Sequence, residues 1–141
     1  MKKLFFLALV VACSRKIVPP PQPDVTIGGA PRARIVLMTE ALATKENGPA
    51  ATIAKFGEVY AFVPSTVAVR PNEPTTFEFW NLQGDDEHDV MLLDRGNRVV
   101  VQFKLPPLQK TSRVFTFHAR GIYRFVCTLH QPEMSGAIVV E

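Results

Sequence analysis

Between residues 33 and 141 the sequence is a succession of short apolar segments, each about the length of one β-strand. The segments are rich in Val, Ile, Phe and Tyr, which favour a pleated and half-buried surface, and turn residues lie between many of them. They are RIVLM (34–38), TVAV (66–69), TFEFW (76–80), DVMLL (89–93), VVVQF (99–103), VFTFH (114–118), IYRFV (122–126) and AIVV (137–140). Seven or eight short strands in about 110 residues predict an all-β fold, an antiparallel β-sandwich.

Local signals between these segments agree with this fold class. DRGN (94–97) predicts a tight turn between two strands. The one stretch with helical character is Glu40 to Lys45, and ENGPA (46–50) ends it at once. Cys127 is the only cysteine of this region, which excludes an immunoglobulin domain with a disulfide between its sheets.

The first twelve residues, MKKLFFLALVVA, have the layout of an export signal. Two lysines precede an apolar run from Leu4 to Val11, which is far shorter than the roughly 20 residues of a membrane-spanning helix. The following VVAC resembles a bacterial lipobox, which predicts that Cys13 is acylated and becomes the new N-terminus. The alternative is an ordinary signal peptide cut after Ala12, which would leave an exposed thiol prone to oxidation.

The next segment, SRKIVPPPQPDVTIGGAP (14–31), is rich in Pro and Gly and has no apolar periodicity. We expect an extended tether, which at about 3.1 Å per residue would hold a domain roughly 30–50 Å from a membrane. The predicted organisation is a lipoprotein signal peptide at 1–12, a lipidated cysteine and tether at 13–32, and a domain at 33–141. This organisation predicts a lipid-anchored protein of the bacterial cell envelope, on the periplasmic or extracytoplasmic face of a membrane.

The charge pattern argues against nucleic acid as a partner. The formal net charge is +3, but without Lys2 and Lys3 only 14 of the 16 basic residues remain, against 13 acidic ones. The remaining Lys and Arg residues are scattered and form no basic run that would follow a phosphate backbone.

The segment CTLHQPEM (127–134) places a thiol, an imidazole and a thioether within eight residues. Such soft-to-borderline donors suit copper, which a trigonal set of two His and one Cys with a long axial Met holds in both oxidation states. Zinc fits less well because a thioether is a poor zinc ligand, and iron–sulfur clusters need more cysteines. The second imidazole has to come from His88, just before a predicted strand, or from His118, at the end of one.

Two longer stretches resemble cupredoxins of the plastocyanin, azurin and amicyanin kind. They are FVPSTVAVRPNEPTTFEFWNLQGDDEHDVMLLD (62–94) and GIYRFVCTLHQPEMSGAIVVE (121–141), within a resemblance that covers about 59–141. The resemblance implies a Greek-key β-sandwich with one type 1 copper ion. It implies His88 as the upstream imidazole, Cys127 as the thiolate, His130 as the downstream imidazole and Met134 as the axial thioether. His118 is then expected to be a turn or surface residue.

The sequence departs from the family pattern beside these residues. Leu129 stands where many members have Pro. Asp89 stands where better-known members have an Asn that ties the upstream loop to the residue after the Cys, here Thr128. Asp can accept a hydrogen bond from Thr128 but cannot donate one while ionised. Asp89, Thr128 and Asn81 are the residues expected to surround the ligands. A nearby carboxylate in place of Met134 is the alternative axial ligand.

The resemblance implies a membrane-tethered, monomeric one-electron carrier that is not an enzyme. Its expected partner is a redox protein such as a cytochrome or an oxidase subunit, and electrons would pass through the edge of His130. The acidic cluster Asp85, Asp86 and Glu87 either steers a basic partner or is a solvated loop. The alternative function is copper binding or delivery without rapid electron transfer.

Overall fold

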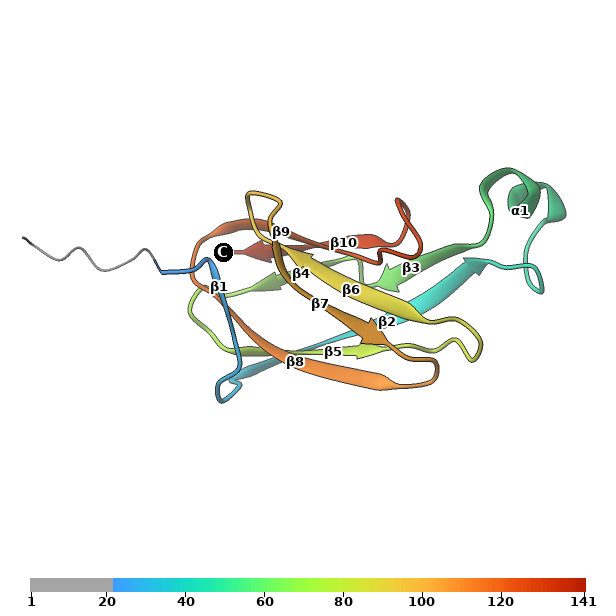
Figure 1. Cartoon of the computed structure of the whole chain (residues 1–141). Coiled ribbons are helices and arrows are strands. Elements are labelled where there is room, and N and C mark those ends of the chain that lie inside the picture. Colours follow the sequence, from blue (N-terminus) through green and yellow to red (C-terminus); the bar gives the residue numbers. More distant parts are fainter. Residues whose placement is uncertain (1–21) are drawn as a thin grey trace, which may run out of the picture.

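The computed structural model describes residues 22–141, which form a sandwich of two five-stranded β-sheets (Figure 1). The strand orders are β1-β8-β5-β2-β3 and β4-β10-β9-β6-β7. The elements are β1 (Val25–Ile27), β2 (Ala33–Ala43), α1 (Ala50–Phe56), β3 (Val59–Val63), β4 (Thr66–Val69), β5 (Thr75–Trp80), β6 (His88–Leu93), β7 (Val99–Leu105), β8 (Lys110–Phe117), β9 (Gly121–Val126) and β10 (Ser135–Val140). The predicted all-β sandwich is confirmed.

Two details of the sandwich differ from the predicted one. It has ten strands and not seven or eight, because the short strands β1 and β3 are absent from the predicted set. In addition, β2 pairs with β5 and β4 pairs with β10 in parallel, so neither sheet is wholly antiparallel. Parallel neighbours cannot be joined by a hairpin, and here long stretches of chain that cross between the sheets separate them.

The predicted helical character of Glu40 to Lys45 is wrong. Strand β2 continues to Ala43 and pairs with β3, and the helix α1 begins only at Ala50. Leu37 and Thr39 alternate with more exposed neighbours along β2 and enter the core. Pairing of Glu40, Ala41 and Ala43 with β3, in continuation of the buried part of β2, outweighs the weak helix propensity of this stretch.

The folded domain begins before the predicted boundary at Ala33. Val25 of β1 is buried and pairs with Phe117 of β8. Asp24 accepts two hydrogen bonds from the guanidinium of Arg95, at 2.9 and 3.2 Å. The last part of the predicted tether is therefore a strand, and three residues are too few to give a recognisable alternation.

The predicted signal peptide and Cys13 lie outside the described residues. Within residues 22–141 no helix is long and apolar enough to cross a membrane.

The core between the sheets consists largely of aromatic side chains at alternate strand positions. Thr75, Phe77 and Phe79 of β5 are buried, and the residues between them are half-buried. The ring of Phe77 packs edge-on against Phe115, with the centroids 5.6 Å apart. Since full burial of one such side chain contributes roughly 1.5–3 kcal/mol, the apolar core holds the fold.

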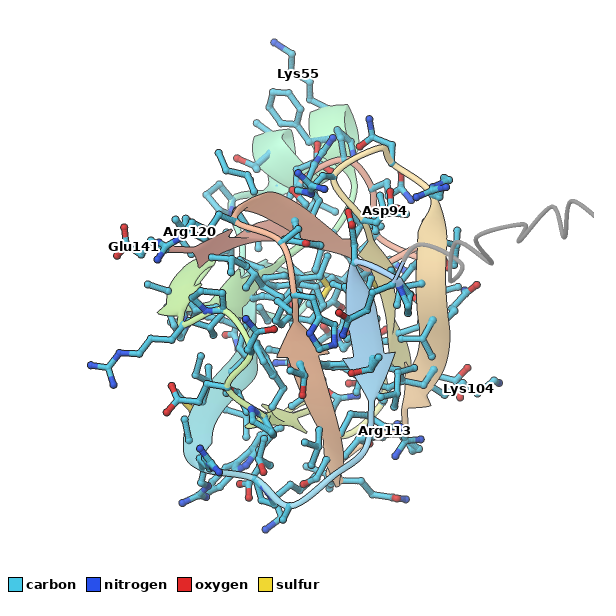
Figure 2. The ribbon with its side chains drawn as sticks, turned by 90° about the vertical axis from the view of Figure 1, so that its left-hand side faces the viewer. Lys55, Asp94, Lys104, Arg113, Arg120 and Glu141 are labelled. Carbon is cyan, nitrogen blue, oxygen red and sulfur yellow. The ribbon has the colours of Figure 1, made fainter. Side chains whose placement is uncertain are left out.

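The sandwich has two distinct ends. Strands β6 and β9 are antiparallel, with Met91 opposite Val126, so the start of β6 and the loop after β9 lie at one end, here called the His88 end. Helix α1 also lies there, whereas β1 lies at the opposite end, here called the His118 end (Figure 1). Charged side chains such as Lys104 and Arg113 lie on the outside of the molecule (Figure 2).

Candidate metal centre

Three of the predicted ligands meet at the His88 end. His88 is the first residue of β6, and Cys127 and His130 follow the end of β9. The Nδ1 atoms of His88 and His130 are 3.1 Å apart. The Sγ atom of Cys127 lies 3.9 Å from Nδ1 of His88 and 3.6 Å from Nδ1 of His130. One sulfur and two imidazole nitrogens therefore face a common point.

Met134 closes the loop that carries Cys127 and His130. Its carbonyl accepts a hydrogen bond from the backbone N–H of Cys127 at 2.9 Å, and its own N–H donates to the carbonyl of His130 at 3.0 Å. The Met134 side chain is fully buried. These bonds close residues 127–134 into a compact loop at the junction of β9 and β10, which carries the buried side chain of Met134.

Burial determines the protonation of the two innermost ligands. His88 and Cys127 are both fully buried. Burial, followed by the charge of His130, lowers the pKa of His88 from 6.5 to about 4, so this imidazole is neutral at pH 7. Burial also raises the pKa of the Cys127 thiol, because a thiolate without a counter-charge is unfavourable there. A bound cation would compensate the thiolate and use the imidazole lone pairs.

Asp89 joins the two loops that carry the ligands. Its carboxylate accepts hydrogen bonds from the backbone N–H of Thr128 at 2.5 Å, the Thr128 hydroxyl at 2.6 Å and the amide of Gln102 at 2.7 Å. Burial acts to raise the pKa of Asp89, but the hydrogen bonds from Thr128 and Gln102 outweigh it and hold that pKa below its usual value. An ionised Asp therefore makes the link to Thr128 that the family's Asn suggested.

Asn81 holds the upstream loop from the inside. It is buried, and its amide donates to the carbonyls of Asp86 at 2.8 Å and Leu105 at 2.9 Å. Its oxygen accepts hydrogen bonds from the backbone N–H of Gln83 at 3.0 Å and the hydroxyl of Thr39 at 3.2 Å. Asn81 thus supports the loop before His88.

No protein-family model and no curated protein sequence matches the chain. Solved structures do match. Amicyanin from Paracoccus versutus is 19% identical, covering 85% of this chain and 100% of its own, with a TM-score of 0.54. Auracyanin A from Chloroflexus aurantiacus is 18% identical (77% and 98% covered, TM-score 0.56), and the auracyanin from Roseiflexus castenholzii is 16% identical (79% and 99% covered, TM-score 0.55). The chain has a cupredoxin fold.

The donor set within this cupredoxin fold fits copper. Two imidazoles, one cysteine sulfur and a buried thioether in the same loop are the ligand types that suit a metal cycling between Cu(I) and Cu(II). Zinc would leave the thioether of Met134 without a role. His88, Cys127 and His130 are the one such group of ligand atoms in residues 22–141, all within 4.8 Å of one another.

Tyr60 of β3 is part of the site and was not predicted. Its buried ring lies 5.0 Å from the ring of His88 and 4.5 Å from that of His130, centroid to centroid. Its hydroxyl donates to the carboxylate of Asp86 at 2.5 Å, and burial together with this bond raises the Tyr60 pKa. The run of apolar and aromatic residues VYAFV (59–63) was the sequence signal that could have identified this strand.

Two of the three residues of the acidic cluster have partners within the chain. Asp86 accepts the hydrogen bond from Tyr60, and Glu87 forms an ion pair with Lys104 at 2.9 Å. Only Asp85 of the three has no hydrogen-bond or ion-pair partner among the described residues, and it is exposed. This arrangement gives the cluster a structural use and reduces the charge that it could present to a partner.

His118 lies at the other end of the sandwich and does not approach the site. Its two ring nitrogens are hydrogen-bonded to the hydroxyl of Thr26 at 3.0 Å and to the side-chain oxygen of Asn72 at 2.8 Å. The upstream imidazole beside Cys127 is therefore His88 and not His118, as the resemblance implied.

His130 connects the buried sulfur with the surface. It is half-buried, whereas Cys127 is fully buried, and Leu129 beside it is 56% exposed. The loop therefore connects the buried sulfur of Cys127, through His130, with an apolar part of the surface beside Leu129.

Proposed function

We propose that the His88 end holds one copper ion and that the protein is a one-electron carrier tethered to a membrane of the bacterial cell envelope. The observation that carries this proposal is the convergence of His88, Cys127 and His130 within 4.8 Å at one end of a cupredoxin fold. Auracyanin A, one of the proteins with the same fold, is described as a blue copper protein.

Copper would supply the change of oxidation state, and the chain supplies a site that needs little rearrangement. His88 is held within β6 and paired with Leu105 of β7, so its backbone is part of a sheet. Cys127 is fixed through the Met134 carbonyl, and Asp89 ties its neighbour Thr128 to the start of β6. Ligands on strand ends and in a closed loop are held in place before the metal binds.

The proposed tether rests on VVAC and on the position of β1. The described chain enters the sandwich at the His118 end, opposite the ligands (Figure 1). Acylation of Cys13 would therefore leave the His88 end free to meet a redox protein. Cys13→Ser should abolish fatty-acid labelling and membrane association, and equal labelling of variant and unchanged chain would remove the lipid anchor from the proposal.

The electron-carrier proposal is tested with the copper-loaded full chain. We expect an intense blue colour from the Cys127 thiolate and a reversible one-electron wave in voltammetry. A colourless protein that binds only Cu(I) would instead indicate copper delivery, the alternative function. Failure to bind either oxidation state would contradict both.

A further inference from the structure

Gln83 contacts the side of His88 that faces away from the other ligands. The Nδ1 atom of His88 is directed at His130 and Cys127, at 3.1 and 3.9 Å. The Nε2 atom of the same ring lies 3.1 Å from the side-chain oxygen Oε1 of Gln83. Each nitrogen of this buried ring therefore has a separate partner.

The orientation of the Gln83 carboxamide follows from its other contacts. Its Nε2 group donates to the carbonyl of Thr39 at 3.5 Å, and its Oε1 atom accepts from the Thr39 hydroxyl. Its backbone N–H donates to the side-chain oxygen of Asn81 at 3.0 Å. A carboxamide turned the other way would place its oxygen against the Thr39 carbonyl, so Oε1 faces His88.

A neutral imidazole carries one proton, on one of its two nitrogens. Because Gln83 Oε1 is only an acceptor, its contact with His88 is a hydrogen bond when Nε2 carries that proton. The lone pair then resides on Nδ1, the atom that faces Cys127. No side chain among residues 22–141 forms a hydrogen bond with Nε2 of His130, so only the tautomer of His88 is fixed by such a contact.

We propose that Gln83 is a positioning residue that holds His88 in the Nε2–H tautomer and so directs the Nδ1 lone pair into the metal site. Thr39 and Asn81 hold Gln83 in this orientation through their hydrogen bonds to it. This inference deepens the proposed function, but it concerns the tautomer of a buried imidazole and holds whichever metal binds.

The first test is ¹⁵N nuclear magnetic resonance of the His88 ring in the metal-free full chain at neutral pH. The proposal predicts the Nε2–H tautomer in the unchanged chain. Gln83→Glu keeps an acceptor oxygen at the same distance and should preserve this tautomer. Gln83→Met has a similar volume but no acceptor, and it should give a mixture of tautomers. Gln109→Met, an exposed glutamine at the same end, is the matched control and should change nothing.

The second readout is the Cu(I) dissociation constant from competition with a colorimetric chelator. Loss of a hydrogen bond to a ligating His typically weakens metal binding about 10- to 100-fold, which is expected for Gln83→Met. Gln83→Glu should rescue the affinity to within a few-fold of the unchanged chain. Thermal unfolding of the metal-free variants separates this effect from a loss of folding.

An Nδ1–H tautomer in the unchanged chain would overturn the proposal without any variant. An unchanged tautomer and dissociation constant in a folded Gln83→Met would do the same. If Gln83→Met does not fold, Thr39→Val, which frees the carboxamide to rotate, should mix the tautomers, and an unmixed signal counts against the proposal. A chain that shows the Nε2–H tautomer but no reversible redox wave would refute the carrier function alone.

Discussion

The two ends of the sandwich use the same residue types for opposite purposes. At the His118 end, both ring nitrogens of His118 are occupied by Thr26 and Asn72, so the imidazole fastens strand β1 to the domain. At the His88 end, one nitrogen of His88 is occupied by Gln83 and the other faces Cys127. An available ring nitrogen, rather than the presence of a histidine, therefore distinguishes a candidate ligand from a structural residue.

The carboxylates repeat this contrast. Asp94 accepts hydrogen bonds from the backbone of Gly96 at 2.8 Å and of Arg98 at 2.9 Å, and so closes a local turn. Asp89 instead accepts bonds from Thr128, which lies 39 residues away in sequence. The pKa of each carboxyl is held below its usual value, for Asp94 chiefly by the backbone of Arg98. One carboxylate organises a turn and the other organises the site.

The largest expected effect is that of Cys127→Ser. A serine hydroxyl cannot supply the thiolate-to-copper charge transfer, so the intense visible band should vanish completely. The variant should still unfold cooperatively on heating, because the aromatic core and not the site holds the fold. A variant that remains fully blue would remove Cys127 from the site, and loss of cooperative unfolding would make the His88 end essential to folding.

The two histidines should then separate the two ends. His88→Ala removes a ligand and should weaken copper binding by at least about 100-fold, on the scale of a few kcal/mol. His118→Ala removes two hydrogen bonds and should lower the free energy of unfolding by roughly 1–3 kcal/mol, with unchanged copper affinity. Copper titration and chemical denaturation of both variants measure this, and an exchange of the two phenotypes would reverse the assignment.

The stability of the metal-free fold should depend on pH through His88. The pKa of His88 falls from 6.5 to about 4 on folding, so the neutral ring stabilises the metal-free fold above about pH 6.5. As the pH falls from about 6.5 to 4, the unfolded chain takes up a proton that the folded chain does not. Stability should therefore drop by up to about 3 kcal/mol over this range. His88→Ala should flatten this part of the profile, and an equally steep profile in that variant would contradict the shift.

The smallest of these effects compares the carboxylates. Asp89→Asn removes a negative charge beside the site, which destabilises Cu(II) relative to Cu(I) and should raise the reduction potential. A rise of about 60 mV corresponds to roughly 1.4 kcal/mol for one electron. Asp94→Asn, at the other end, should destabilise its turn and leave the potential unchanged. Equal potentials in all three proteins would show that Asp89 does not influence the metal.

The sequence contained the fold class and three of the four proposed ligands because these depend on short-range patterns, whereas His88 was chosen through the family resemblance. Alternating apolar residues indicated most strands, and CTLHQPEM placed three donors in one loop. Other features depend on contacts that only the fold creates. Strand β1 is too short for a pattern, the parallel pairs join distant strands, and Gln83 looks like any polar loop residue until His88 is placed beside it. Tyr60 was recognisable as a strand residue but not as a neighbour of the histidines.

The proposed one-electron copper site is tested most directly by copper K-edge X-ray absorption of the full chain loaded with one copper, in both oxidation states. We expect one sulfur at a short distance and two imidazole nitrogens around a single copper, with little change in these distances on reduction. His118→Ala should give the same spectrum, whereas His88→Ala should show one imidazole nitrogen fewer around the copper. A copper surrounded only by nitrogen and oxygen, or one that changes its ligands on reduction, would contradict a one-electron site at the His88 end.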